Sequence, residues 1–197
     1  SNNPFLIGGQ QVNTVKYSRL VEGSPFLTDA YQPGTIGTKK GEKYVGLKVK
    51  LNLSDQEIYY LDDKGNEMVL TSPVDYVILT NASNAIITQF NFFPKSVEDE
   101  IWGWLQLLAM GSGVSVYKRH LKTMEETTPY GSATKQQKIL TNFQYYALSN
   151  GVWKKLKKME ELADIIPAKQ QEILNFIKTN KLKMKADEDW AKLATIL

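Results

Sequence analysis

Two tryptophans separated by one residue, Trp102 and Trp104, have the side-chain type and spacing best suited to a binding site in this sequence. If residues 101–109 form a strand, both tryptophans point to the same side together with Gln106, because successive side chains alternate between faces. The opposite face is also apolar, so this strand is buried on both sides or one face lines a ligand groove. Aromatic pairs at this spacing can stack on sugars or on an apolar ligand, whereas a place in the core is the commoner role of large aromatics.

His120 is the single histidine. In a strand that starts at Val114 it shares a face with Lys118 and Lys122, which predicts a solvated, basic strand edge. Histidine metal sites usually need a second imidazole or strong carboxylate help, and no G-x-S-x-G motif supports a serine–histidine pair. We therefore predict no metal ligand and no nucleophilic triad at this position.

Four acidic clusters could supply the two carboxylates that glycoside hydrolysis requires. They are Asp62-Asp63, Glu98-Asp99-Glu100, Glu125-Glu126 and Asp187-Glu188-Asp189. Each cluster is expected at a turn or at the start of a helix, where carboxylates are common for local reasons. We therefore predict no catalytic residue among them, and carboxylate catalysis stays an alternative that requires two of them to converge in space.

Residue types that are missing exclude further classes of site. None of the 197 residues is a cysteine, so disulfides, thiolate nucleophiles and cysteine-bound metals are excluded. Gly111-Ser112-Gly113 is not followed by the lysine of a phosphate loop, and no dinucleotide-binding motif follows a strand. We predict no cofactor.

The charge and hydropathy patterns bear on the kinds of partner. The net charge is only +3, and the stretch from Lys154 to the end mixes ten lysines with seven acidic residues. Lysines on small helices normally form a solvated face, so we predict no nucleic-acid partner. No apolar run approaches the ~18 residues of a bilayer-spanning helix, so we predict no helical membrane span.

The clearest strand signal runs from Lys43 to Leu53. Aliphatic residues occupy every second position from Val45 onward, and the positions between them are mostly polar. This period of two places one aliphatic face against a core, whereas helical spacing would scatter the same residues around a cylinder. Lys40-Gly41 predicts a turn that leads into this strand from residues 34–38.

Turn-forming residues predict further strands along the chain. Asp62 to Asn66 separates two β-rich runs, and Asn150-Gly151 is the strongest short hairpin signal in the sequence. The strands expected around these turns and between them cover residues 58–61, 68–71, 74–79, 86–93, 144–148 and 152–156.

Residues 101–109 are ambiguous between strand and helix. Gly111-Ser112-Gly113 follows them and a second β-rich run begins at Val114, which favours a hairpin. Ser96 could instead cap a short helix that includes Trp102. Both alternatives stay open on the sequence alone.

The last forty residues change in character. Residues 159–166 predict a helix, and Pro167 suits the first position of the next one because its missing N–H is not needed there. Ile173, Phe176 and Ile177 share a face at helical spacing, and a last helix is expected from Asp187. Helices this short need a surface to pack on, so we expect them to cover the sheet.

These elements predict an α+β fold that is mainly antiparallel β, a meander curled into a sandwich or partly open barrel with C-terminal helices packed on it. Residues 1–157 form the β-rich region and 158–197 the helical segment. No linker-like tract separates the two, which favours a single domain.

Several stretches resemble a known family. Together they cover most of the chain in short patches, and they are Tyr17-Ser18-Arg19-Leu20-Val21-Glu22-Gly23-Ser24-Pro25-Phe26, Pro33-Gly34-Thr35, Val49-Lys50-Leu51-Asn52-Leu53, Tyr60-Leu61-Asp62, Pro129-Tyr130-Gly131 and the tail from Leu174 to Leu197. They are similar to a family of uncharacterised exported proteins of Bacteroidota bacteria. The resemblance implies a periplasmic or secreted protein and implies no activity. Ser1 to Pro4 show no signal peptide, as expected for a mature exported chain.

Three functions are compatible with the sequence. The favoured one is non-catalytic binding of a small apolar or sugar-like ligand, or of a protein partner, near Trp102, Trp104 and Gln106. A carboxylate hydrolase in the same groove is the second. A structural or assembly role, in which an exposed strand edge pairs with a partner, is the third.

Overall fold

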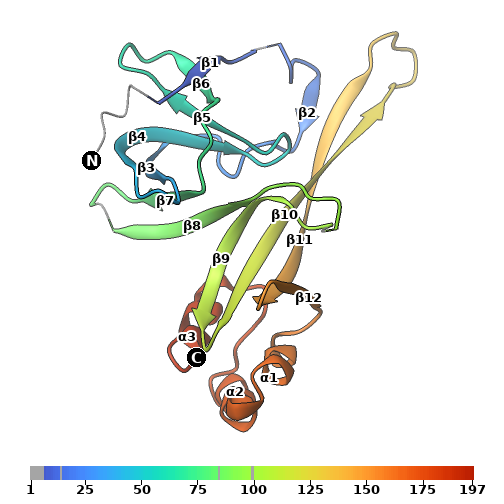
Figure 1. Ribbon diagram of the computed structural model, residues 1–197. Coiled ribbons are helices and arrows are strands. Elements are labelled where there is room, and N and C mark those ends of the chain that lie inside the picture. The colour runs from blue at the N-terminus through green and yellow to red at the C-terminus, as the bar shows by residue number, and fades with distance from the viewer. Residues whose placement is uncertain (1–6, 14, 84, 99) are drawn as a thin grey trace. The chain divides into compact units, whose positions relative to one another are not determined.

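A computed structural model describes residues 7–13, 15–83, 85–98 and 100–197 (Figure 1). Over these residues the chain is mostly antiparallel β sheet with three short C-terminal helices packed on it, and the sheet is not closed. The expected fold class is therefore confirmed. Ser1 to Pro4, on which the signal-peptide expectation rested, lie outside the described residues.

The elements are numbered as in Figure 1. The strands are β1 (Gly9–Gln11), β2 (Leu20–Glu22), β3 (Gln32–Gly37), β4 (Lys43–Asn52), β5 (Glu57–Leu61), β6 (Glu67–Leu70), β7 (Tyr76–Thr80), β8 (Ile86–Phe93), β9 (Gly103–Gly111), β10 (Val114–Thr127), β11 (Gln136–Ser149) and β12 (Val152–Leu156). The helices are α1 (Leu162–Ile165), α2 (Gln170–Thr179) and α3 (Asp187–Ala194), with 3-10 turns η2 (Met159–Glu161) and η3 (Pro167–Lys169).

The chain divides into two compact units. Unit 1 consists of Ser1–Trp104 and His120–Asn142, and unit 2 consists of Leu105–Arg119 and Phe143–Leu197. Strands β9, β10 and β11 contribute residues to both. The last strand ends at Leu156 and the first helical turn begins at Met159.

The sheet of unit 1 has the strand order β1-β6-β5-β4-β3-β7-β8, each strand antiparallel to its neighbours. Short turns join β3 to β4, β4 to β5, β5 to β6 and β7 to β8. Those between β3 and β4 and between β5 and β6 were predicted from their turn residues. The short strand β2 was not expected; it pairs in parallel with β11, with Leu20 opposite Gln137. The buried core of this unit includes Ile36, Val49, Val77, Phe90 and Trp104.

A β-bulge corrects one detail of the predicted strand over residues 43–53. The alternation placed Val45 on the buried face, but it is 41% exposed. The pairing register shifts between Gly34 and Ile36, opposite Val45 and Gly46, and Gly46 adopts a φ of +76° that few other residues tolerate. The extra residue moves Val45 out of phase with the buried Leu47.

Strand β9 settles the ambiguity of residues 101–109. The alternative prediction of a short helix capped by Ser96 is wrong, because no helix occurs among the described residues 94–102. Gly103 opens the strand with a φ of +98°, so Trp102 lies before β9 and does not take part in its alternation. The prediction that Trp102 and Trp104 share one strand face assumed a strand from residue 101, whereas β9 begins at Gly103.

Two tight hairpins each have glycine at the second position of a two-residue turn. Ser112-Gly113 joins β9 to β10, and Asn150-Gly151 joins β11 to β12. In both turns two successive residues have positive φ, +51° and +76° in the first and +51° and +75° in the second. This is the turn whose twist matches the flanking strands, and Asn and Gly tolerate it best.

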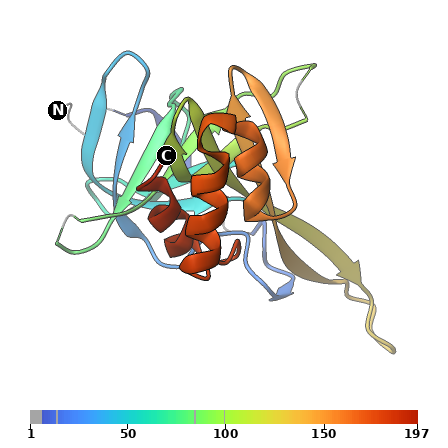
Figure 2. The ribbon, with the colours of Figure 1, turned by 90° about the horizontal axis from the view of Figure 1, so that it is seen from below.

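The helices of unit 2 pack on strands of the same unit (Figure 2). Pro167 begins a helical turn as predicted, and Ile173 and Ile177 of α2 are buried on one face. Trp190 of α3 is fully buried and donates from Nε1 to the Met184 carbonyl at 2.8 Å. The helical residues complete a core with Ala109, Val114, Val116, Tyr145, Ala147 and Leu156 of the strands.

Asp187 fixes the start of α3 to the strands. Its two carboxylate oxygens accept hydrogen bonds from Gln106 Nε2 at 2.9 Å and from Lys118 Nζ at 3.0 Å. Gln106 and Lys118 are both buried, and the Lys118 ammonium also lies 4.2 Å from the centre of the Phe143 ring. A carboxylate in the first helical turn is stabilised by the helix dipole as well.

In the part of the chain that the structure describes, no helix combines the length and the apolar character needed to cross a bilayer.

We expect Asp187→Ala to lower the unfolding free energy by about 2–3 kcal/mol, because it leaves one buried amide and one buried ammonium without their shared acceptor. Urea unfolding measures the effect. Glu188→Ala is the matched control, since it removes the same charge from an exposed position of the same helical turn. Equal losses in the two variants would contradict the anchoring role.

Candidate functional site

A pocket of about 330 Å³ opens in unit 1. It lies between the β5–β6 hairpin, the segment that leads into β7, the end of β8 and the start of β9. Its volume is at the lower end of the ~300–1000 Å³ range of small-molecule sites. It is lined by Gln56, Glu57, Ile58, Leu70, Ser72, Pro73, Val74, Asp75, Phe92, Pro94 and Trp104.

Two aromatic rings form part of the apolar wall. The rings of Phe92 and Trp104 are tilted by 46° with their centres 5.2 Å apart. Trp104 is only 5% exposed, so most of its indole belongs to the core of unit 1 and a small part is open to the pocket. Ile58 and Val74 are buried beside the pocket and extend the apolar surface.

Four polar residues share the lining, and two of them are acidic. Burial raises the pKa of Glu57; the nearby Lys16 charge opposes this rise and the Asp55 charge adds to it. Asp75 is engaged locally, because its carboxylate accepts a hydrogen bond from the Lys39 backbone N–H. Of the two carboxylates in the lining, Glu57 is therefore the one with the smaller role in holding the fold together.

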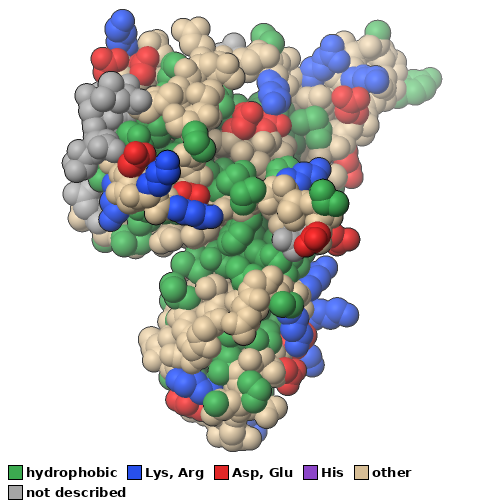
Figure 3. Space-filling model, in the orientation of Figure 1, with side chains coloured by type: hydrophobic (Ala, Val, Ile, Leu, Met, Phe, Trp, Pro, Cys, Tyr) green, Lys and Arg blue, Asp and Glu red, His purple; other side chains and the backbone are tan. Residues whose placement is uncertain are grey.

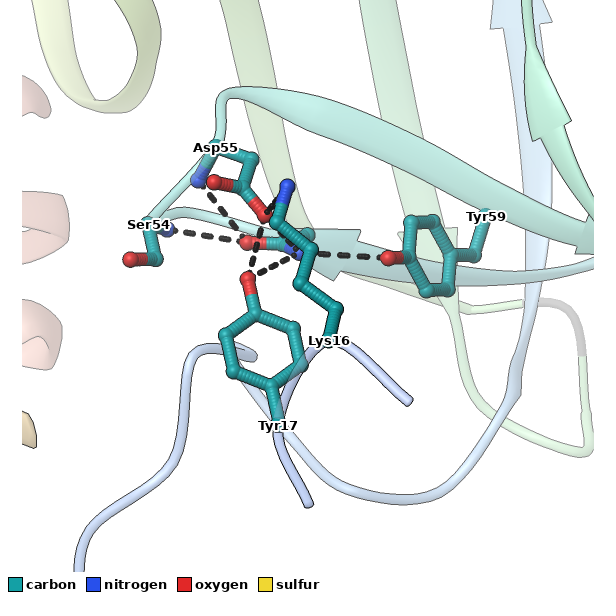
Figure 4. A network of polar contacts seen from close by, with 6 residues as sticks. Lys16, Tyr17, Ser54, Asp55 and Tyr59 are labelled. Carbon is teal, nitrogen blue, oxygen red and sulfur yellow. Dashed lines mark hydrogen bonds and ion pairs between the residues drawn. The ribbon is translucent and has the colours of Figure 1, made fainter. Parts of the chain in front are cut away.

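A buried amide holds the turn that carries Gln56 and Glu57 (Figure 4). Asn52 is fully buried, and its Oδ1 accepts from the backbone N–H groups of Ser54 and Asp55 at 3.1 and 2.9 Å. Its Nδ2 donates to the Tyr17 hydroxyl and to Asp55 Oδ2, each at 3.0 Å. One side chain thus links the β4–β5 turn to the N-terminal segment.

Asp55 joins the same network as an ion. It accepts hydrogen bonds from Lys16 Nζ at 2.7 Å and from the Tyr17 hydroxyl. Burial alone would raise the pKa of Asp55, but the bonds from Lys16, Tyr17 and Asn52 outweigh burial and hold that pKa below its usual value. The carboxylate is therefore ionised in the folded protein at neutral pH.

Gln56 connects this turn to the aromatic wall. It has a φ of +58°, its Nε2 donates to the Leu53 carbonyl at 2.7 Å, and its Oε1 accepts from the Trp104 N–H at 2.6 Å. A Cβ at Gly103 would come within 2.4 Å of Gln56 Oε1, so only glycine permits this approach. The Gln56 side chain therefore fixes the backbone position from which Trp104 projects.

The structure separates the three residues that the sequence singled out. Trp104 lines the pocket, whereas Trp102 does not, and the Lys95 ammonium lies 5.5 Å from the centre of the Trp102 ring. Gln106 belongs to unit 2, where its amide is bound to Asp187. Sequence reasoning missed Phe92 and Glu57 because their approach to Trp104 depends on long-range packing that no local pattern records.

The expectation that His120 lies on a solvated strand edge is wrong. Its side chain is buried and its ring centre lies 5.6 Å from that of Phe90, so it packs in unit 1 and does not stand on a solvated edge. Lys118 is also buried, against Asp187. The strand was predicted correctly, but contacts with Phe90 and with Asp187 bury His120 and Lys118.

The acidic clusters have mixed outcomes. Asp62 accepts hydrogen bonds from the Lys64 and Asn66 backbones and so stabilises its turn, as expected. Asp187 starts α3, also as expected. Glu125-Glu126 lies within strand β10 rather than at a turn, which corrects that prediction, and Asp99 lies outside the described residues.

Comparisons with known proteins found no matching family model, no similar curated protein and no similar solved structure. The site is therefore interpreted from its own geometry.

We expect Asp55→Asn to lower the unfolding free energy by about 1–3 kcal/mol at pH 7, because it removes a charged acceptor of three hydrogen bonds. The pKa of Asp55 is lowered by folding, so its contribution is present above the unfolded value of about 3.9 and is lost as the pH falls through the folded value. The difference between wild type and variant should therefore shrink from pH 7 to pH 3.

Chemical unfolding at a series of pH values tests this prediction. Asp63→Asn, at an exposed turn position, is the control and should change the unfolding free energy by less than about 0.5 kcal/mol. A difference for Asp55→Asn that stays constant down to pH 3 would mean that its carboxylate does not stabilise the folded state as an ion.

Proposed function

We propose that this protein binds a small ligand, apolar or sugar-like, in the pocket beside Trp104, without catalysing its conversion. The observation that carries the proposal is the pocket itself: an aromatic and aliphatic wall with a few polar groups grouped on it. This combination is what small-molecule sites generally offer, since the apolar wall supplies affinity and the polar groups supply orientation.

The lining favours particular ligand chemistry. Two of its residues are acidic, and no lysine, arginine or histidine is among them. Glu57 and Ser72 offer acceptors to hydroxyl or amine donors, while a ligand carboxylate would meet like charge. We therefore infer a neutral or cationic ligand that places an apolar edge against Phe92 and Trp104 and its donors toward Glu57.

A carboxylate hydrolase is the second candidate, because Glu57 and Asp75 both line this pocket. A raised pKa, as at Glu57, suits a general acid. Binding ranks first because the carboxylate of Asp75 already accepts the Lys39 N–H and is committed to the backbone turn there. Release of product from a bound oligosaccharide, abolished by Glu57→Gln, would reverse this ranking.

Export to the periplasm or the outside of the cell is part of the proposal and rests on the sequence resemblance to exported Bacteroidota proteins. Fractionation of cells that express the complete gene tests it, and recovery of the protein in the cytoplasm would contradict it.

We expect tryptophan fluorescence to respond to neutral oligosaccharides or alkyl amines and not to fatty acids. Trp104→Phe should remove most of the response and weaken binding about tenfold, while Trp102→Phe, the matched control, should leave affinity unchanged. Calorimetry on the same variants separates loss of the fluorescent reporter from loss of binding.

Glu57→Gln is expected to weaken binding by about tenfold to a hundredfold, because a hydrogen bond to a charged group is lost. In the wild type, protonation of Glu57 should have the same effect, so affinity should fall as the pH drops through its raised pKa. Unchanged affinity in Glu57→Gln and in Trp104→Phe, with the fold intact by circular dichroism, would place the ligand elsewhere.

A further inference from the structure

Strands β10 and β11 continue in unit 1 as a two-stranded ribbon that we call the arm, residues 120–142 (Figures 1 and 2). All residues from Thr123 to Thr127 on β10 are exposed, and so are those from Leu140 to Asn142 on β11. Both faces of this part of the ribbon are therefore in contact with solvent, which is unusual for a ribbon of only two strands.

One edge of the arm has no partner strand. The pairing of β10 with β9 reaches Lys118 opposite Gln106, and β9 begins only three residues earlier, at Gly103. From Lys122 to Thr127, β10 therefore has β11 on one side and, among the described residues, no strand on the other. Unpaired N–H and C=O groups along such an edge are a template for another strand.

The charges along this edge indicate which strand fits it. Its sequence is Lys122-Thr123-Met124-Glu125-Glu126-Thr127, and charged side chains of both signs are visible on the arm (Figure 3). In a two-fold symmetric antiparallel pair the axis is perpendicular to the sheet, so one residue lies opposite its own copy. The choice of that central residue decides every other pair.

Of the possible centres, Met124 alone makes opposite charges meet directly. It places Lys122 opposite Glu126 of the second copy, and by symmetry this pair occurs twice. A centre at Glu125 or Glu126 would oppose two identical carboxylates, and a centre at Thr123 would put Lys122 opposite Met124. Opposite charges directly across a pair of strands stabilise it, and like charges destabilise it.

Within one copy, Lys122 and Glu126 make only weak, exposed contacts in the arm itself. Lys122 Nζ donates to Thr141 Oγ1 at 2.9 Å, and Glu126 accepts from Gln137 Nε2 at 3.3 Å and lies 3.6 Å from Lys135 Nζ. Each of these contacts runs to the β11 side or to the turn between the strands.

We propose that the free edges of β10 in two copies of this chain pair antiparallel about Met124 and form a homodimer. The interface is a continuous sheet through the two arms, with two Lys122–Glu126 ion pairs and a central Met124–Met124 contact. This assembly uses the arm alone and is independent of the ligand pocket.

Charge-swap variants test the proposal by sedimentation velocity across a protein concentration series. Lys122→Glu and Glu126→Lys should each weaken dimerisation by about tenfold to a hundredfold, because each turns two attractive pairs into repulsive ones. An equimolar mixture of these two variants should dimerise again, and so should the double variant. Unfolding curves that match the wild type show that the arm is intact.

A wild type that stays monomeric, or single variants that dimerise as well as the wild type, would overturn the proposal. So would a mixture of the two single variants that remains monomeric, because complementary charges would then have no effect on association.

A cysteine placed at the centre gives an independent readout, since the chain has no other cysteine. Residues directly opposite each other across antiparallel strands lie about 4.5–5.5 Å apart between Cα atoms, within reach of a disulfide. Met124→Cys should therefore form a crosslinked dimer on mild oxidation. Thr127→Cys is equally exposed but lies about 20 Å from its copy in this register and should crosslink far less; equal crosslinking at both positions would contradict the register.

Discussion

A single buried amide, that of Asn52, is the interaction on which the candidate site depends. An uncharged polar side chain inside a core is tolerated only when its donors and acceptors are used, and here both are. The bonds to Ser54 and Asp55 shape the turn after β4, and those to Tyr17 and Asp55 hold the N-terminal segment against it. Gln56 leaves this turn with a positive φ and reaches the backbone of Trp104. The geometry of the pocket wall thus depends on one side chain that lies 40 residues from Phe92 and 52 residues from Trp104 in the sequence.

Local patterns predicted most of the strands and helices, because their physical causes are local. Alternation identified β4, Asn150-Gly151 identified the last hairpin, and Pro167 marked the start of a helical turn. The errors in predicting which side chains are buried occurred where a single residue shifts the alternation of a strand. The bulge at Val45-Gly46 and the positive φ of Gly103 at the start of β9 both shift which side chains face inward, and a strict period of two cannot show such a shift.

The candidate site was less predictable than the fold. Trp104 was identified from its type, but the partners that give it a pocket come from β5, β8 and the segment before β7. His120 shows the same limit: the residues two positions before and after it are lysines, yet its ring packs against Phe90. A strand pattern indicates which residues share a face, and only tertiary packing decides whether that face is solvent-exposed or buried.

The parallel pair between β2 and β11 has a consequence for synthesis of the chain. Leu20 leaves the ribosome more than a hundred residues before Gln137, its partner. At about 5–20 residues per second, the wait lasts on the order of 6–20 s, far longer than a hairpin needs to form. Asn52, the hydrogen-bond partner of Tyr17, is synthesised much earlier. The N-terminal segment can therefore be bound beside β4 while β11 is still being synthesised. The order in which these contacts become available is built into the sequence, and it keeps β2 close to its place until translation delivers β11.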